Sequence, residues 1–309
     1  MYFSGIGDEA GNTIDAQIQA TQDLGWRNIE ARNVEVPGYP KGNIHDLPEK
    51  AFDILAGKLA DAGIHINCFG SAIANWGKKI DQPFDSSLAE ARRAIPRMQR
   101  LGTKLVRIMS FAVREDEDQM IDERVRRLRE ITKLFLGAGL QPVHENCMNY
   151  GGMGWPFTLE LIDKVPGLKL VFDTANPVFN ADRTKSKPYP KQDPWEFYTQ
   201  VKDHVAHVHV KDAKWNPAKN DADYTFPGEG DGKVRPILKD LLTRGYDEGI
   251  SIEPHMVVVF HDAASKASNE AMRVNYVEYG RRLEKMANEI RIELAQTKTL
   301  KSTEPVAAR

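Results

Sequence analysis

Residues 207–212 read His207-Val-His209-Val-Lys211-Asp212 and close a short apolar run, Val205–Val210, of the kind that forms a buried strand. Three other apolar runs beyond residue 140 also end on a residue able to bind a divalent metal. They end at Glu145, Asp173 and Glu253. If these strands lie side by side in a parallel sheet, the four side chains converge on one point at its carboxyl edge. The pattern therefore predicts a parallel sheet with a metal site at its edge.

Similar short apolar runs recur along the whole chain. We expect eight strands, at Phe3–Ile6, Asn28–Ala31, His65–Phe69, Leu105–Ser110, Gln141–Glu145, Lys169–Phe172, Val205–Val210 and Ile250–Glu253. Amphipathic segments of helical length alternate with them, at Thr13–Leu24, Leu47–Ala62, Ser86–Leu101, Asp118–Leu136, Phe157–Val165, Trp195–Val201, Val234–Arg244 and Ala267–Asn288. Glycines follow several of these helices, as a helix stop requires. This alternation predicts an α/β fold with a single (β/α)8 TIM barrel over residues 1–290 and a polar tail over residues 291–309.

Composition narrows the class of protein. The chain has 309 residues, 41% of them hydrophobic and 28% charged, with a net charge of −2. This balance is typical of a soluble globular protein and gives no basic footprint for nucleic acid. Cys68 and Cys147 are too few for a disulfide framework, and no apolar run is long enough to span a membrane. We expect a cytoplasmic protein without a membrane or nucleic-acid partner.

The four strand-end residues form a coherent ligand set. Two glutamates, one aspartate and one histidine supply three oxygens and one nitrogen, which suits Mn²⁺, Mg²⁺, Co²⁺ or Zn²⁺. Three converging carboxylates without a cation would repel one another and raise each other's pKa. We therefore expect the metal ligands to be Glu145, Asp173, His209 and Glu253. The alternative is that the acids only begin loops and the histidine only packs.

Glu145 and Glu253 also suggest acid–base chemistry. They come from the fifth and eighth expected strands, so they could approach a small carbonyl compound from different sides. One carboxylate could remove a proton and the other return it, while the metal polarises the carbonyl and stabilises an enediolate. The alternative is that both carboxylates only bind the metal.

Six strand-end motifs resemble those of one family. They are Ile29-Glu30-Ala-Arg32, Phe69-Gly70-Ser71, Val106-Arg107-Ile-Met-Ser110, Phe172-Asp173-Thr174, His209-Val-Lys211-Asp212 and Ser251-Ile-Glu253. With them, the chain resembles the metal-dependent xylose-isomerase-like sugar isomerase/epimerase superfamily over nearly its whole length. The resemblance implies the same four ligands and one divalent metal, most often Mn²⁺. It also implies that the two glutamates exchange protons with a ketose, as in the epimerase branch.

The chain departs from that family at two positions. Cys147 and Asn176 stand where many relatives carry histidine. His144 precedes Glu145, so strand alternation points it away from the metal unless a bulge turns it inward. We include His144 among the candidate substrate-binding residues, which also comprise Asn176, Lys211 and Arg107. Glu30 and Arg32 end the second strand, where an internal ion pair and a substrate contact are both open.

Two functions fit these residues. The first is a sugar isomerase or epimerase acting on a ketose or keto-sugar. The second is a lyase or deglycosidase that eliminates the C1 substituent of a 3-keto-glycoside, with a small partner subunit. Long loops at Asn180–Asp193 and Asp212–Lys233 and the loop tryptophans suit a bulky substituent or a partner. Both functions imply a small carbohydrate substrate, and the chain could also form a homo-oligomer.

Overall fold

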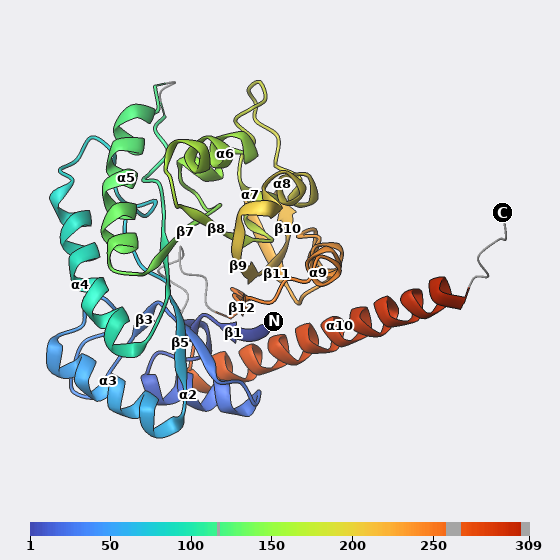
Figure 1. Ribbon diagram of the computed structural model, residues 1–309, viewed down its shortest axis with the longest axis horizontal. Helices are drawn as coiled ribbons and strands as arrows, with labels where there is room; N and C mark the ends of the chain where they lie inside the picture. Colours follow the sequence, from blue (N-terminus) through green and yellow to red (C-terminus); the bar gives the residue numbers. More distant parts are fainter. Residues whose placement is uncertain (116–117, 258–266, 304–309) are drawn as a thin grey trace.

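Eight parallel strands form the centre of the fold (Figure 1). The computed structural model describes residues 1–115, 118–257 and 267–303. The strands are β1 (Tyr2–Gly5), β2 (Asn28–Ala31), β5 (His65–Phe69), β6 (Leu105–Ile108), β7 (Gln141–Glu145), β8 (Lys169–Asp173), β9 (Val205–Val210) and β12 (Gly249–Ile252). They pair in the order β1-β12-β9-β8-β7-β6-β5-β2. A parallel bridge between Ile6 and Glu30 brings the two edge strands together, so the sheet is a nearly closed barrel and the predicted fold is confirmed.

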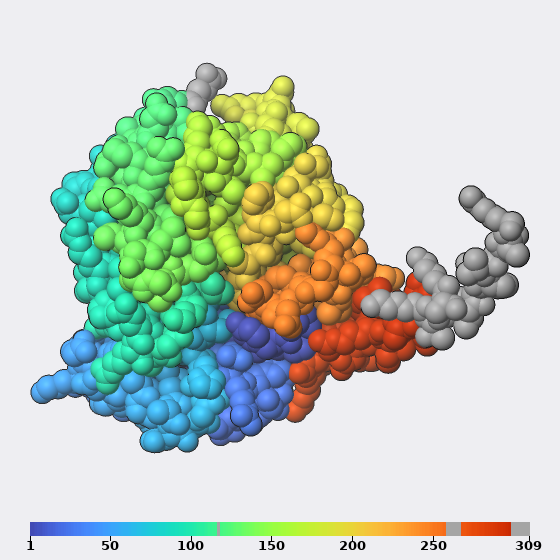
Figure 2. Space-filling model, in the orientation of Figure 1, coloured from blue at the N-terminus to red at the C-terminus, as the bar shows by residue number. Residues whose placement is uncertain are grey.

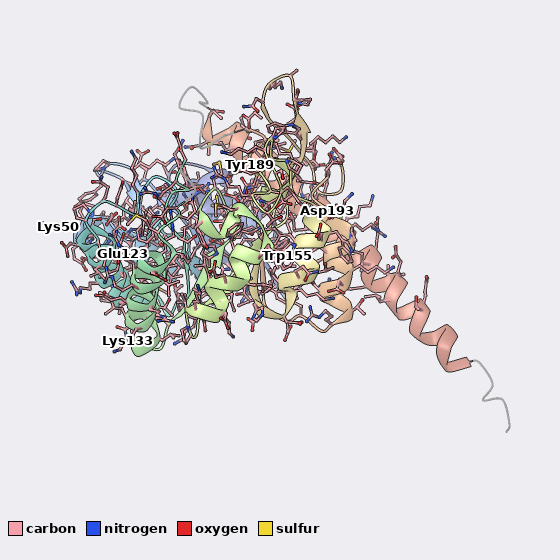
Figure 3. All side chains as sticks on the ribbon, turned by 90° about the horizontal axis from the view of Figure 1, so that it is seen from above. Lys50, Glu123, Lys133, Trp155, Tyr189 and Asp193 are labelled. Atoms are coloured by element: carbon pink, nitrogen blue, oxygen red, sulfur yellow. The ribbon has the colours of Figure 1, made fainter. Side chains whose placement is uncertain are left out.

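Helices surround this barrel in the order that the sequence predicts. The longer ones are α2 (Ile14–Asp23), α3 (Glu49–Ala62), α4 (Asp85–Leu101), α5 (Ile121–Gly137), α6 (Trp155–Lys164), α8 (Pro194–Val201), α9 (Val234–Thr243) and α10 (Asn269–Thr303). Gly63 and Gly102 adopt left-handed backbone conformations directly after α3 and α4, where a residue with a Cβ would be strained. Asp193, labelled in Figure 3, directly precedes α8. Its carboxylate accepts a hydrogen bond from the Glu196 N–H at 2.8 Å.

Short helices, a 3₁₀ turn and two hairpins lie at the carboxyl ends of the strands. They are the helices α1 (Gly7–Ala10) and α7 (Asn176–Phe179), the 3₁₀ turn Tyr150–Met153, and the hairpins β3 (Asn33–Val34) with β4 (Gly42–Asn43) and β10 (Asp212–Asn216) with β11 (Asp221–Thr225), whereas the 3₁₀ turn Lys202–His204 lies at the amino end of β9. The second hairpin lies in the long loop 212–233 that the sequence marks as unusual. These pieces form the rim of the barrel mouth.

The last helix differs from the prediction. It begins at Asn269 rather than Ala267 and continues to Thr303, through most of the predicted tail. Buried Tyr276, Tyr279, Leu283 and Ile290 anchor its first part against the barrel. Beyond them the helix extends away from the body of the molecule (Figures 1 and 2). Residues 304–309 of the predicted tail lie outside the described part, and the division into barrel and tail stays a prediction.

The core is divided between two environments. Apolar side chains fill the space between strands and helices in two large clusters. The inside of the barrel differs, because it holds the buried polar side chains of Glu30, Arg107, His207 and His209 beside a small apolar cluster of Cys68, Val143 and Val171. On β9 the histidines at 207 and 209 alternate with Val208 and Val210, so one strand serves both environments. Among the described helices, none is long and apolar enough to cross a bilayer.

Candidate metal and substrate site

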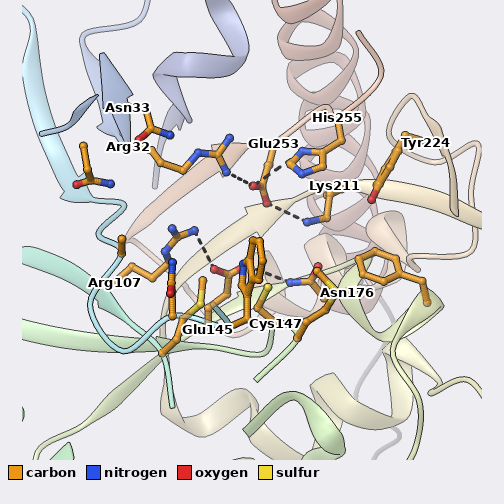
Figure 4. Close-up of a pocket in the computed structure, with 17 residues that line it drawn as sticks. Arg32, Asn33, Arg107, Glu145, Cys147, Asn176, Lys211, Tyr224, Glu253 and His255 are labelled. Carbon is orange, nitrogen blue, oxygen red and sulfur yellow. Dashed lines mark hydrogen bonds and ion pairs between the residues drawn. The ribbon is translucent and has the colours of Figure 1, made fainter. Parts of the chain in front are cut away.

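A cavity of about 240 Å³ opens at the carboxyl ends of the strands. Its polar lining includes Arg32, Arg107, Glu145, Asn176, Lys211, Glu253 and His255 (Figure 4). Phe179 and Tyr224 contribute aromatic side chains to the wall. The cavity thus lies where barrel enzymes place their active sites.

The four predicted ligands come together beside this cavity, and Glu145 and Glu253 line it. Glu145, Asp173, His209 and Glu253 each offer one ligand atom, and these atoms all lie within 4.8 Å of one another. All four side chains are buried. They come from the ends of β7, β8, β9 and β12, and Asp173 pairs directly with His209 across the sheet. The convergence expected from the sequence is present.

The orientation of His209 suits metal binding. Its Nε2 lies 3.0 Å from both carboxylate oxygens of Glu30, which fixes the ring. Its Nδ1 faces Glu145 Oε1 at 3.7 Å and Glu253 Oε2 at 3.9 Å, and it has no hydrogen-bond partner among the described residues. A buried imidazole with one nitrogen held by a carboxylate and the other unpaired is the usual arrangement of a metal-ligating histidine.

The two glutamates are held in matching ways on opposite sides of His209. Arg107 donates to Glu145 Oε2 at 2.9 Å, and Arg32 donates to Glu253 Oε1 at 2.7 Å (Figure 4). In each case the second oxygen is the one that faces His209 Nδ1. Each glutamate therefore has one oxygen fixed by an arginine and one directed toward the candidate metal position.

Further hydrogen bonds and ion pairs hold the carboxylates of the four candidate ligands. Asn176 Nδ2 donates to Glu145 Oε1 at 3.0 Å, and Lys211 Nζ lies 3.0 Å from both Asp173 Oδ2 and Glu253 Oε2. The other oxygen of Asp173 accepts hydrogen bonds from the backbone N–H groups of Ala175 and Asn176 at the start of α7. Lys211 thus supplies positive charge between two of the carboxylates.

The site packs opposite charges close together in a buried environment, and this shifts the pKa values of its members. Burial opposes ionisation of Glu145, yet Arg107 and His209 lower its pKa to about 2. For Asp173, burial together with the charges of Glu253 and Glu145 outweighs Lys211 and raises the pKa to about 6. Burial works against protonation of His209, but Glu30 and Glu145 raise its pKa to about 10. The raised pKa of Asp173 shows that its carboxylate is incompletely compensated, and a divalent cation would supply the missing positive charge.

Within the described part of the chain, three other groups of side chains are close enough together to hold a cation. Glu30, His207 and His209 already hydrogen-bond one another, with His207 Nε2 at 2.8 Å from Glu30 Oε2. Glu9 and His255 are paired at 2.7 Å, and Asp46 in the group with His45 and Glu90 is 40% exposed. The group at the four strand ends is the one that combines an unpaired ligand nitrogen with three buried carboxylates.

Three of the four predicted substrate-binding residues line the cavity, namely Arg107, Asn176 and Lys211. The fourth, His144, lies on the opposite face of β7, where its Nε2 is 3.0 Å from Ser110 Oγ and 3.1 Å from Asn149 Oδ1. No bulge turns it inward, and burial lowers its pKa to about 4, so it packs as a neutral side chain. The inclusion of His144 among the substrate contacts is therefore corrected.

The cavity also contains residues that the sequence did not single out. His255 adopts a left-handed backbone conformation with φ 52°, and its ring lies 5.1 Å from that of Tyr224. Its position two residues after Glu253 could have placed it on the same face, but β12 ends at Ile252 and the alternation rule no longer applies there. Glu9 lies behind the cavity lining as the partner of His255, and it belongs to the short helix α1, whose four residues carry no usable periodicity.

The chain belongs to the xylose isomerase-like TIM barrel family, whose model matches residues 18–275. A comparison with curated proteins finds no match. Among solved structures, an L-ribulose 3-epimerase is 13% identical with a TM-score of 0.66, covering 96% of this chain and 97% of its own.

Two further solved structures are similar in fold. A xylose isomerase-like TIM barrel protein from Mycobacterium smegmatis in complex with magnesium is 16% identical (TM-score 0.65; 93% and 97% of the two chains covered). The probable 3-DHS dehydratase AsbF from Bacillus anthracis is 17% identical (TM-score 0.62; 89% and 97% covered). At these identities the likeness shows the fold, and the chemistry rests on the site itself.

Proposed function

We propose that the protein is a divalent-metal-dependent isomerase or epimerase of a ketose or keto-sugar. Glu145, Asp173, His209 and Glu253 hold the metal, for which we propose Mn²⁺ ahead of Mg²⁺, Co²⁺ or Zn²⁺. The relative solved with magnesium supports a hard divalent ion in this fold. The two cysteines are unpaired, which agrees with a cytoplasmic location.

The observation that carries the proposal is the matched pair of glutamates. Glu145 and Glu253 come from strands separated by β8 and β9, and they face each other across His209 Nδ1. When bound, the metal would polarise the substrate carbonyl and so acidify the neighbouring C–H. Both glutamates have pKa values below the ordinary range, because arginine and other cations outweigh burial, so each can begin as a proton acceptor.

The surrounding residues position the proton transfer. The carboxylate that takes the proton can return it to the adjacent carbon, which gives isomerisation. Delivery from the other glutamate, on the opposite face, gives epimerisation. Arg107 and Arg32 keep the two carboxylates in place, and Asn176 in the cavity wall can bind a hydroxyl group. Every cation in this wall already has a carboxylate partner, which favours an uncharged sugar over a phosphorylated one.

Solvent exchange tests this proposal. Metal-loaded wild type is incubated with a panel of ketoses in deuterated water, and the recovered sugars are analysed by NMR. We expect deuterium at the carbon beside the carbonyl of any converted sugar. Glu253→Gln should abolish the exchange, whereas Glu248→Gln, a change at an exposed residue close in sequence, should leave it intact. Conversion of a sugar without any incorporated deuterium would contradict proton transfer through a solvent-exchanging group.

A second candidate function is the elimination of a substituent from a 3-keto-glycoside. The same glutamates could remove the proton beside the ketone, and the substituent at C1 would then leave. The similarity to a probable dehydratase and an apolar cavity next to the site support this alternative. Release of the free aglycone from an oxidised glycoside, measured by chromatography, would favour elimination over epimerisation.

A further inference from the structure

A second cavity of about 270 Å³ adjoins the candidate active site. Trp76 and Met148 line both cavities, so the two spaces meet at these side chains. The second cavity continues between the segment after β6 and the segment after α7, where Val113 and Asn180 contribute to its wall. A ligand in the first cavity could therefore extend into the second without leaving the rim of the barrel.

The side chains between the two cavities are unusually apolar for an exposed position. Trp76 is 43% exposed and Met148 is 40% exposed, although both are large hydrophobic residues. Val113, Met153 and two alanines extend this apolar surface within the second cavity. Contiguous exposed apolar side chains beside a polar site are typical of a ligand-binding surface.

The second cavity also holds a polar group that lacks a partner. Asn180 is 8% exposed, and its Nδ2 makes no hydrogen bond with any described residue. A buried amide donor without a partner is costly unless a ligand or water supplies an acceptor. Asn180 directly follows α7, whose first residue, Asn176, lines the active-site cavity. One short element thus presents a carboxamide to each cavity.

The charges of the two cavities differ. The first is lined by charged side chains that form ion pairs with one another. In the second, the charged lining residue within the described part is Arg183, which donates to the Arg114 carbonyl at 3.1 Å. A polar sugar suits the first space, whereas an apolar group suits the second.

We propose that the second cavity is a subsite for an aromatic substituent of the sugar, one that carries an acceptor oxygen for Asn180. Aromatic rings pack well on an indole and make favourable contacts with a thioether. A second sugar would need several hydrogen-bond partners, but Asn149 and Arg183 in this lining are already engaged and Asn180 supplies the unpartnered donor, so the occupant is an aryl group and the substrate is of the aryl glycoside class. This assignment rests on the proposed function for the identity of the sugar part, but the aryl subsite can be measured alone.

Trp76 can report ligand binding in the second cavity, because its side chain lines that cavity. The protein is labelled with 5-fluorotryptophan, and the ¹⁹F resonance of Trp76 is assigned by its loss in Trp76→Phe. Phenol, phenyl β-D-glucopyranoside and methyl β-D-glucopyranoside are then titrated in turn. We expect a saturable shift of the Trp76 resonance with phenol, which carries no sugar part, and a larger shift with the phenyl glycoside than with the methyl glycoside at the same concentration, because Trp76 also borders the sugar cavity. The four other tryptophan resonances report whether each variant remains folded.

Two variants test the wall of the subsite. Met148→Ala should weaken phenol binding by about fivefold, the equivalent of about 1 kcal/mol of lost contact. Asn180→Ala should weaken phenol but not benzene, since it removes the amide that meets the oxygen. Val274→Ala, a change at an apolar residue 58% exposed on α10, should alter neither affinity.

Several results would overturn the subsite. They are a Trp76 resonance that ignores phenol, an equal response to the methyl glycoside, and an unchanged phenol affinity in Met148→Ala. The titration is repeated on Asp173→Asn, which should lose the metal and all turnover. If phenol still binds there, the subsite stands whatever becomes of the proposed function. If metal and sugar bind normally but phenol does not, the proposed function stands and the subsite fails.

Discussion

The orientation of a single histidine decides what the site can hold. His209 presents Nδ1 to the two glutamates because Glu30 occupies its Nε2 at 3.0 Å. Glu30 also accepts from His207 at 2.8 Å, and burial is outweighed by both histidines, so its pKa lies well below the usual range. The carboxylate is thus ionised and acts through His209 rather than on the substrate. From the sequence, Glu30 was expected either to form an ion pair inside the barrel or to contact the substrate. Its hydrogen bonds to the two histidines could not be predicted.

Replacement of Glu30 by glutamine should weaken metal binding without removing a ligand. The amide can no longer hold both histidines as an anion, so His209 loses its fixed orientation and part of its basicity. We expect the Kd for Mn²⁺ to rise by about 10- to 100-fold, measured by isothermal titration calorimetry. Glu35→Gln alters an exposed glutamate just after β3 and should leave the Kd unchanged. An unaltered Kd in Glu30→Gln would show that Glu30 does not support His209.

Lys211 should contribute most to the free energy of unfolding when the protein is free of metal. Its ammonium lies 3.0 Å from Asp173 and from Glu253, so Lys211→Met leaves two buried carboxylates without that partner. We expect the metal-free variant to lose about 3–5 kcal/mol of unfolding free energy, as when one partner of a buried ion pair is removed. Added Mn²⁺ should then stabilise the variant more than it stabilises wild type, measured by urea denaturation with and without metal.

The matched control for this lysine is Lys239→Met. Lys239 is 49% exposed and pairs with Glu293 at 3.2 Å, so its loss should change stability by less than about 1 kcal/mol. Equal stability of metal-free Lys211→Met and wild type would contradict the charge balance inferred for the site.

At the scale of elements, helix boundaries and loops are where sequence and structure differ most. The end of α10 was misplaced because its polar residues after position 290 lack the apolar periodicity on which the prediction relied, although they have good helical propensity. The long loop 212–233, which the sequence marks only by its length, carries glycines at positions 228, 230 and 232. In the structure it folds around Asp212, whose carboxylate accepts from the N–H groups of Gly228, Gly230 and Gly232. A Cβ at Gly230 would lie 2.4 Å from that carboxylate.

The packed part of α10 should contribute far more to stability than its exposed part. Leu283 is fully buried against the barrel, whereas Ile292 is 58% exposed on the same helix. We expect Leu283→Ala to lower the unfolding free energy by about 2–5 kcal/mol, and Ile292→Ala to change it by less than about 0.5 kcal/mol. Chemical denaturation of both variants measures the difference. Similar losses in the two would mean that the projecting part of the helix is also packed.

The segment between β4 and α3 should make stability depend on pH. His45 is fully buried, and burial, with help from Lys78, Arg93 and Arg97, outweighs Asp46 and lowers its pKa to about 4. Because its pKa in the unfolded chain is about 6.5, the unfolded state binds the proton first as the pH falls. Above pH 6.5, His45 is neutral in both states and does not lower the free energy of unfolding. Between pH 6.5 and pH 4, preferential protonation of the unfolded state lowers that free energy by up to about 1.4 kcal/mol per pH unit.

A non-titrating replacement isolates this effect. Between pH 7 and pH 4, as a working range, the free energy of unfolding of His45→Gln should fall less steeply than that of wild type. Urea denaturation at a series of pH values gives both curves. Parallel curves would show that His45 does not titrate differently in the two states.

At the scale of the whole molecule, the sequence predicted the barrel and the convergence of four ligands, because each strand carried its own local signal. All eight expected strands are present, and their order follows from right-handed crossovers. The orientation of His209, the arginine anchors and the adjoining apolar cavity could not be predicted. They depend on contacts between strands and loops far apart in the chain, such as Glu30 with His209 and Arg32 with Glu253.

The stoichiometry of metal binding tests the central claim most directly. Asp173 belongs only to the group at the four strand ends, whereas His255 belongs only to the group with Glu9. In equilibrium dialysis against Mn²⁺, we predict a single ion per chain for wild type and for His255→Asn, and none for Asp173→Asn at the same free metal concentration. An ion retained by Asp173→Asn but lost from His255→Asn would contradict the account, because the metal would then lie outside the four strand-end residues.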